Sequence, residues 1–169
     1  MTAEARRRQI QNILQTSNTP ISATALAGEF SVSRQVIVGD VAILRASGVE
    51  ISATPRGYMI LRENTGIIRQ IVCHHSDEQM EKELHAIVDH GCTVLDVIVE
   101  HPVYGQLTGS LQLSNRYDVQ QFLERCAQSS AHPLSHLTEG IHLHTLSCPS
   151  EDAFHRVTKI LTETNILLH

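Results

Sequence analysis

The hydrophobic positions near the start of the chain recur at the three- and four-residue spacing of amphipathic helices. The pattern predicts a first helix over residues 3–16, a short second helix over 23–27 and a longer third helix over 34–46. Ser22 and Ser33 stand where the second and third helices need N-caps. One shared core can form from Leu26, Ala27, Val32, Val36, Ile37, Val41 and Leu44. A short helix, a brief turn and a longer helix are typical of a helix-turn-helix.

Two β-prone runs follow at residues 49–52 and 58–61, joined by the turn residues Thr54-Pro55-Arg56-Gly57. They predict a β-wing with Arg56 exposed, so the first domain is expected to be a winged helix. In this fold the start of the third helix enters the major groove, while the wing approaches the minor groove or the backbone. Solvated arginines and a protein-interaction module are the alternatives. The predicted DNA contacts are Ser33, Arg34, Gln35 and Arg56.

The residues after position 65 alternate between β-branched runs and helical repeats. Strands are predicted over residues 67–72, 93–99, 107–113 and 141–146, and helices up to residue 88, over 117–127 and over 150–163. Ser76 and Gln79 form a predicted capping box for the first of these helices, which Gly91 ends. The order β-α-β-β-α-β-α predicts a single open sheet with helices on one side, an α+β sandwich.

Charge and composition divide the chain at the same place. Residues 1–65 hold seven arginines and five acidic residues, a net charge of +2, whereas residues 66–169 carry a net charge of −7. All eleven histidines and all four cysteines lie beyond residue 72. We therefore expect two domains, a DNA-binding domain over residues 1–64 and a ligand- and metal-sensing domain over residues 65–169. Only the first domain has the charge to attract phosphates.

The chain has no run of 18 or more apolar residues, and its N-terminus lacks the apolar stretch of a signal peptide. We expect a cytoplasmic protein that does not associate with a membrane. The spacing of Cys73, Cys92, Cys126 and Cys148 matches neither a disulfide framework nor a zinc ribbon. Buried free thiols are therefore expected.

Four side chains of the second domain form a candidate metal site. His142 and His144 are two residues apart on a predicted strand, so their imidazoles point to the same face. His75 follows another predicted strand, and Glu83 lies on the next helix. Three imidazole nitrogens and one carboxylate suit a divalent transition metal, and nickel, zinc, iron and cobalt all fit this set.

Other interpretations of these residues stay open. Alternating polar residues also occur on the open face of a sheet without any chemical role. His74 is expected to point to the strand face opposite His75. Glu78 and Glu81 compete with Glu83, and all three carboxylates have a solvated helix face as their ordinary role.

The ordered motifs of the chain resemble those of the niacin-responsive transcriptional repressors, in which a winged helix precedes a three-histidine (3H) sensor domain. Besides the winged helix, the resemblance is carried by His75…Glu83-Leu84, Asp89-His90-Gly91, Asp96-Val97, His101-Pro102-Val103-Tyr104-Gly105, Pro133-Leu134-Ser135-His136-Leu137-Thr138 and Gly140-Ile141-His142-Leu143-His144. It implies a homodimeric repressor of NAD-precursor (niacin) salvage or uptake genes with nicotinic acid as corepressor. It also implies a transition metal in an HPr-like open-faced sandwich, with the family's ligand pattern falling on His75, Glu83, His142 and His144.

Nicotinate is a small aromatic anion, so its pocket needs an apolar slot, a positive charge or a metal, and hydrogen-bond donors. Its pyridine nitrogen could itself coordinate the metal. The candidate donors near the predicted ligands are His101, Tyr104, Arg116 and Thr138. Tyr104 in a turn and Arg116 before a helix have structural roles as alternatives. A homodimer of winged helices is expected to read a palindromic operator in double-stranded DNA.

Two other functions compete with a niacin-responsive repressor. A metal-dependent hydrolase is one, because such a metal can activate water. The chain has no nucleophile motif and no phosphate-cradling glycine loop, and its fused DNA reader favours a regulator, so we do not expect an enzyme. A winged-helix metalloregulator is the other alternative, and its affinity for DNA would follow the metal concentration itself.

Overall fold

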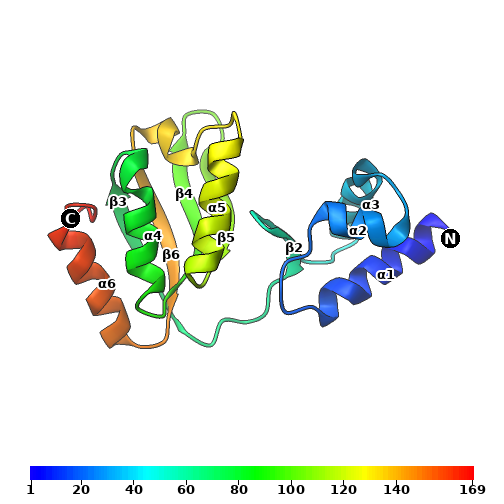
Figure 1. Ribbon diagram of the computed structural model, residues 1–169, viewed down its shortest axis with the longest axis horizontal. Coiled ribbons are helices and arrows are strands. Elements are labelled where there is room, and N and C mark those ends of the chain that lie inside the picture. Colours follow the sequence, from blue (N-terminus) through cyan, green and yellow to red (C-terminus); the bar gives the residue numbers. More distant parts are fainter. The chain divides into compact units, whose positions relative to one another are not determined.

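The computed structural model describes all 169 residues and divides into two compact units, Met1–Glu63 and Asn64–His169 (Figure 1). Each unit has a hydrophobic core of its own. No helix combines the length with the apolar composition that crossing a bilayer requires.

The first unit is a winged helix, as predicted. Its elements are α1 (Ala3–Thr16), α2 (Ala23–Phe30), α3 (Arg34–Ala46), β1 (Ile51–Thr54) and β2 (Gly57–Ile60). Ser22 and Ser33 cap α2 and α3, because each hydroxyl accepts a hydrogen bond from the backbone N–H three residues further on. The largest buried side chains of its core are Ile10, Leu14, Leu26, Ile37 and Val41.

Two details of the first unit differ from the expectation. α2 continues past Ala27 and ends at Phe30. Ser31, the next residue, adopts the left-handed conformation (φ 52°) that ends the helix. Val36, which was expected in the core, is 38% exposed on α3. The wing strands lie within two residues of their predicted bounds.

Arg8 pairs with Glu4 within α1, and three other arginines of the first unit connect its elements. Arg6 and Arg7 of α1 pair with the buried Asp40 of α3, at 2.6 and 3.4 Å. Arg45 of α3 donates from Nε to the Ile51 carbonyl at 2.8 Å, which ties the helix to the wing. These three side chains therefore hold the elements of the unit together.

The second unit is an open-faced α+β sandwich with the predicted order of elements. Its strands are β3 (Ile67–His74), β4 (Thr93–His101), β5 (Gly105–Leu113) and β6 (Ile141–Cys148), paired antiparallel in the order β3-β6-β4-β5. Its helices are α4 (Met80–Val88), α5 (Arg116–Gln128) and α6 (Glu151–Glu163), with the short 3₁₀ helices η1 (Asp77–Gln79) and η2 (Leu134–Thr138). Figure 1 shows α4 and α5 side by side over the sheet.

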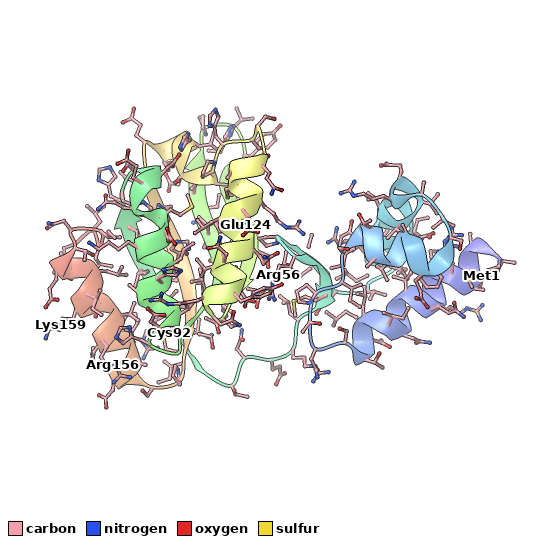
Figure 2. The ribbon with its side chains drawn as sticks, viewed as in Figure 1. Met1, Arg56, Cys92, Glu124, Arg156 and Lys159 are labelled. Atoms are coloured by element: carbon pink, nitrogen blue, oxygen red, sulfur yellow. The ribbon has the colours of Figure 1, made fainter.

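The burial pattern of β6 shows which face of the sheet is covered. Its buried set is His142, His144, Leu146 and Cys148. Leu146 and Cys148 belong to the core that also contains buried residues of α4 and α6, so the two histidines face the helices and not the open side of the sheet. Glu124 of α5 and Lys159 of α6 are exposed, so both helices also keep a side that faces solvent (Figure 2).

The start of α4 departs from the prediction. Ser76 and Gln79 make no side-chain cap, and Gln79 belongs to the 3₁₀ turn η1 that separates Ser76 from the helix, so the predicted capping box is wrong. α4 begins at Met80 instead. The turn leaves His75 within hydrogen-bond distance of Glu83 in the first turn of α4.

The C-terminal residues extend the sheet beyond its edge. The His74 backbone N–H donates to Ile166 at 2.9 Å, and the Leu168 N–H donates to Val72 at 2.8 Å. These bonds place Leu167 opposite Cys73 in an antiparallel bridge. The tail thereby covers the outer edge of β3, which would otherwise present unpaired backbone groups.

Candidate metal centre

Glu83 lies at the centre of the four predicted ligands. Its carboxylate is 1% exposed, at the first turn of α4. One oxygen, Oε2, is 2.7 Å from His75 Nε2, and the other, Oε1, is 3.0 Å from His142 Nε2 and 3.4 Å from His144 Nε2. The fold therefore brings all four side chains to one buried point, although they come from the end of β3, from α4 and from β6.

The outer nitrogen of each imidazole is held by a backbone carbonyl. His75 Nδ1 is 2.7 Å from the Ser76 oxygen, His142 Nδ1 is 2.9 Å from Gly140, and His144 Nδ1 is 2.6 Å from Asp96. Each Nδ1–H donates to its carbonyl, so every Nε2 points towards Glu83. Metal-binding histidines are oriented in the same way, by a hydrogen bond from the nitrogen that does not bind the metal.

A β-bulge at Asp96 makes room for His144. Between the paired positions Val94–Leu146 and Ile98–Leu143, β4 has three residues where β6 has two. The Asp96 carboxylate accepts a hydrogen bond from the Thr145 backbone N–H at 2.9 Å, while its carbonyl accepts the bond from His144. An acidic residue within a β-branched run was the only sequence signal for this role.

The imidazoles around the buried Glu83 carboxylate shift its pKa, and the carboxylate shifts the pKa values of His75 and His144 in turn. Both nitrogens of His75 face acceptors, the Ser76 carbonyl and the Glu83 carboxylate, an arrangement that favours the protonated ring. Burial alone would lower the pKa of His75, but the hydrogen bond and charge of Glu83 raise it, and the pKa of His144 is raised against burial by the same carboxylate. The pKa of Glu83 is held well below its usual value in spite of burial, because the imidazoles surround it.

The donor set fits a divalent transition metal. His144 Nε2 is buried and has no hydrogen-bond partner, which is costly for a polar atom unless something binds it. Three Nε2 atoms and a carboxylate match the ligands that zinc, nickel, iron or cobalt accept. His75, Glu83, His142 and His144 could hold such an ion with no change in which atoms face the centre.

Cys73 is the residue near this centre that sequence analysis did not assign to it. All four cysteines are free, as expected; Cys73, Cys92 and Cys148 are also buried, whereas Cys126 is only half-buried. The Cys73 sulfur, a Glu83 oxygen and a His142 nitrogen all lie within 4.8 Å of one another. Burial, together with the charge and the hydrogen bond of Glu83, raises the pKa of the Cys73 thiol. A position two residues before His75 was the available sequence signal.

The three competing candidates lie outside the cluster. His74 is exposed, since it points to the other face of β3, as expected from the alternation of a strand. Glu78 and Glu81 are also exposed. Glu83 is therefore the carboxylate of this helix that lies among the imidazoles.

The predicted nicotinate contacts lie at different places. Thr138 donates a hydrogen bond to the Ile141 carbonyl, next to His142. His101 shapes the β4–β5 turn, because its Nδ1 accepts from the backbone N–H groups of Val103 and Tyr104 at 3.1 and 3.2 Å. The ring of Tyr104 is near that of His101, and Tyr104 is 73% exposed.

Arg116 lies away from the cluster. Its guanidinium makes two bonds to the Asp89 carboxylate, at 2.7 and 2.6 Å. Asp89 follows the last residue of α4, six residues and about 9 Å along the helix axis from Glu83. Arg116 therefore forms an ion pair, the structural role that was the alternative to a nicotinate contact.

An open cavity of about 840 Å³ adjoins His75. His74, Asp77, His136 and Glu139 are among its lining residues. The His136 ring is 2.7 Å from Asp77 and stacks on His132. The cavity has room for a small organic molecule beside the cluster of His75, Glu83, His142 and His144.

The predicted DNA contacts belong to α3 and the wing. Arg34 and Gln35 are exposed in the first turn of α3. The Ser33 side chain is also exposed, although its hydroxyl is used as the helix cap. Arg56 lies in the turn between β1 and β2 (Figure 2), half-buried rather than fully exposed as expected.

Both units match families of known proteins. The family described as "3H domain" matches residues 68–169, and the family described as "HTH domain" matches residues 6–59. The chain is 39% identical to the "Probable transcription repressor NiaR" of Thermotoga maritima over 165 residues, which cover 98% of this chain and 94% of the relative. The chain belongs to the NiaR-type repressor family.

A second relative with a repressor name supports this assignment. The chain is 41% identical over 167 residues to the "Transcription repressor NadR" of Bacillus subtilis, covering 96% of this chain and 93% of the relative. An "Uncharacterized protein" of Methanothermus fervidus is 24% identical over 108 residues, which are 17% of that longer protein. The NiaR-type repressor is therefore a DNA-binding transcription regulator and not an enzyme.

We expect zinc binding to the NiaR-type repressor to release protons and to weaken as the pH falls. The pKa values of His75 and His144 are raised in the metal-free protein, so below them the metal must displace protons from Nε2. Calorimetric titration of zinc in buffers of different ionisation enthalpy, at two pH values, measures both effects. A binding heat that is independent of the buffer would contradict this prediction.

Proposed function

We propose that this NiaR-type repressor controls NAD-precursor (niacin) salvage or uptake genes and uses nicotinic acid as corepressor, sensed by a metal-containing 3H domain. The observation that carries the proposal is the buried cluster in which three Nε2 atoms converge on Glu83. Support for the effector comes from chemistry, because a divalent transition metal is a Lewis acid that accepts carboxylate oxygen and aromatic nitrogen donors. The pyridine nitrogen of nicotinate belongs to the same donor class as imidazole.

The proposed division of roles follows the contacts of each residue. The metal, when bound, supplies positive charge and accepts ligand donors. His75, His142, His144 and Glu83 would hold it, and the three backbone carbonyls fix the imidazole rings. The open cavity beside His75 offers space next to the cluster. To donate to an effector, Thr138 would have to give up its bond to the Ile141 carbonyl, and Arg116 would have to leave Asp89.

Repression would follow from a shift between dimer arrangements. In the proposal, two copies of the chain read a palindromic operator, with the start of each α3 in the major groove. Nicotinic acid must bind the DNA-competent arrangement more tightly than the other one, because a ligand with equal affinity for both shifts nothing. A homodimer and an effector that acts between its copies are therefore parts of one proposal.

Calorimetric titration tests the effector. Nicotinic acid, with nicotinamide as the control, is titrated into zinc- or nickel-loaded protein and into the His142→Ala, His144→Ala double variant. We expect binding of the acid that is lost in the variant, together with a rise in operator affinity when the acid is added. Absence of binding to folded, metal-loaded protein would refute the niacin proposal. Operator affinity that follows the metal and ignores the acid would favour a metalloregulator.

Replacing Arg34 with alanine is expected to lower operator affinity about tenfold or more, because an arginine–base or arginine–phosphate contact at the start of the recognition helix is lost. Arg8→Ala is the matched control, since Arg8 is an exposed arginine of α1 that pairs with Glu4. The measurement is fluorescence anisotropy on an operator selected by the wild-type protein from a random duplex library. Equal effects of the two variants would argue against a specific role for α3.

A further inference from the structure

We propose that Cys73 is an additional ligand of the metal, so that a thiolate joins the three imidazoles and the Glu83 carboxylate. This inference rests on the metal centre of the proposed function and goes beyond its four expected ligands. It also narrows the class of ion. Thiolate ligands favour zinc, cobalt or nickel, whereas magnesium and manganese prefer oxygen.

Strand pairing places Cys73 beside the cluster. Cys73 is the register partner of His142 in the antiparallel pair of β3 and β6, so both side chains point to the helix-covered face. The Cys73 sulfur, a Glu83 oxygen and a His142 nitrogen lie within 4.8 Å of one another, and all three residues are buried. No other cysteine of the chain belongs to such a group of potential metal ligands.

The cluster also contains a buried polar atom without a hydrogen bond. His144 Nε2 is buried, has no hydrogen-bond partner, and points towards Glu83 Oε1 at 3.4 Å. Its other nitrogen is already bonded to the Asp96 carbonyl. An ion at the centre would satisfy this nitrogen, and the same ion would come within reach of the neighbouring sulfur.

Charge balance favours a second anionic ligand. A divalent ion bound by Glu83 and three neutral imidazoles leaves one net positive charge in a site whose side chains are at most 8% exposed. Burying an uncompensated charge is costly. A thiolate from Cys73 cancels that charge, and the thiol proton leaves to solvent as the sulfur–metal bond forms.

X-ray absorption spectroscopy of the zinc-loaded protein tests the proposal. The samples are the wild type, Cys73→Ser and, as the control, Cys148→Ser, which removes another buried cysteine of the same sheet face. We expect sulfur scattering at about 2.3 Å in the wild type and in Cys148→Ser, and a shell of only nitrogen and oxygen in Cys73→Ser. Zinc affinity, measured by competition with a chelator, is expected to fall about 10- to 100-fold in Cys73→Ser alone.

The outcomes separate this inference from the metal centre itself. Zinc bound by the wild type through nitrogen and oxygen alone would overturn the role of Cys73 and leave the four-ligand centre standing. Sulfur scattering that persists in Cys73→Ser would also overturn it. Failure of the wild type to bind any transition metal would overturn both proposals. If Cys73→Ser does not fold, the wild-type spectrum, compared with that of Cys148→Ser, still decides.

Discussion

Replacing Glu83 with glutamine is expected to lower the zinc affinity of the protein at least about 100-fold. Glutamine keeps the shape of the side chain, but it removes the carboxylate that all three Nε2 atoms approach. A loss of charge at the centre of a buried site should exceed the 10- to 100-fold loss that is typical when only a supporting residue is removed. Competition with a chelator of known affinity measures the change.

The matched control is Glu81→Gln, which neutralises an exposed carboxylate on the same helix. We expect its zinc affinity to equal that of the wild type. Glu83→Gln should also release fewer protons on binding zinc, because the carboxylate raises the pKa of His75 and of His144 in the metal-free protein. Wild-type affinity and proton release in Glu83→Gln would show that the metal, if bound, is held elsewhere.

Replacing Gly140 with alanine is expected to destabilise the second unit by about 3 kcal/mol or more and to weaken zinc binding. Gly140 has a φ of 95°, which costs other residues about 1–3 kcal/mol. A Cβ there would also lie 2.5 Å from the His75 carbonyl oxygen, so the two segments would have to separate. The Gly140 carbonyl accepts the bond from His142 Nδ1, and the shift would therefore move two predicted ligands at once.

Gly105→Ala separates the backbone cost from the clash. Gly105 also has a positive φ, 71°, but nothing lies within 4 Å of the position that its Cβ would take. We expect a loss of about 1 kcal/mol and unchanged zinc affinity for this variant. Chemical unfolding and chelator competition on both variants provide the comparison. Equal losses of stability would mean that the contact between Gly140 and His75 is not needed for the site.

Local sequence information was sufficient where a structure depends on neighbouring residues. The helices and strands follow from hydrophobic spacing, and Ser22 and Ser33 cap their helices because a cap involves only three or four consecutive positions. The common orientation of His142 and His144 follows from the two-residue period of a strand. The same reasoning failed at Ser76, where a capping motif is present but the chain forms a 3₁₀ turn.

The centre itself depends on contacts between segments far apart in the chain. Spacing could propose His75 and Glu83 as partners of the β6 histidines, but only the packing of α4 on the sheet brings them together and turns the histidines away from the open face. The bulge at Asp96 and the approach of Cys73 to Glu83 arise from strand register, which residue patterns do not specify.

The sequence by itself determined two domains, their elements, the resemblance to a repressor family and a short list of potential ligands, because each of these is encoded in local pattern or in ordered motifs. Tertiary structure alone decided that Glu83 is the central carboxylate, that Arg116 is held by Asp89, and that a thiol lies beside the imidazoles. The physical reason is that burial and strand pairing, and not spacing along the chain, set which polar atoms face one another.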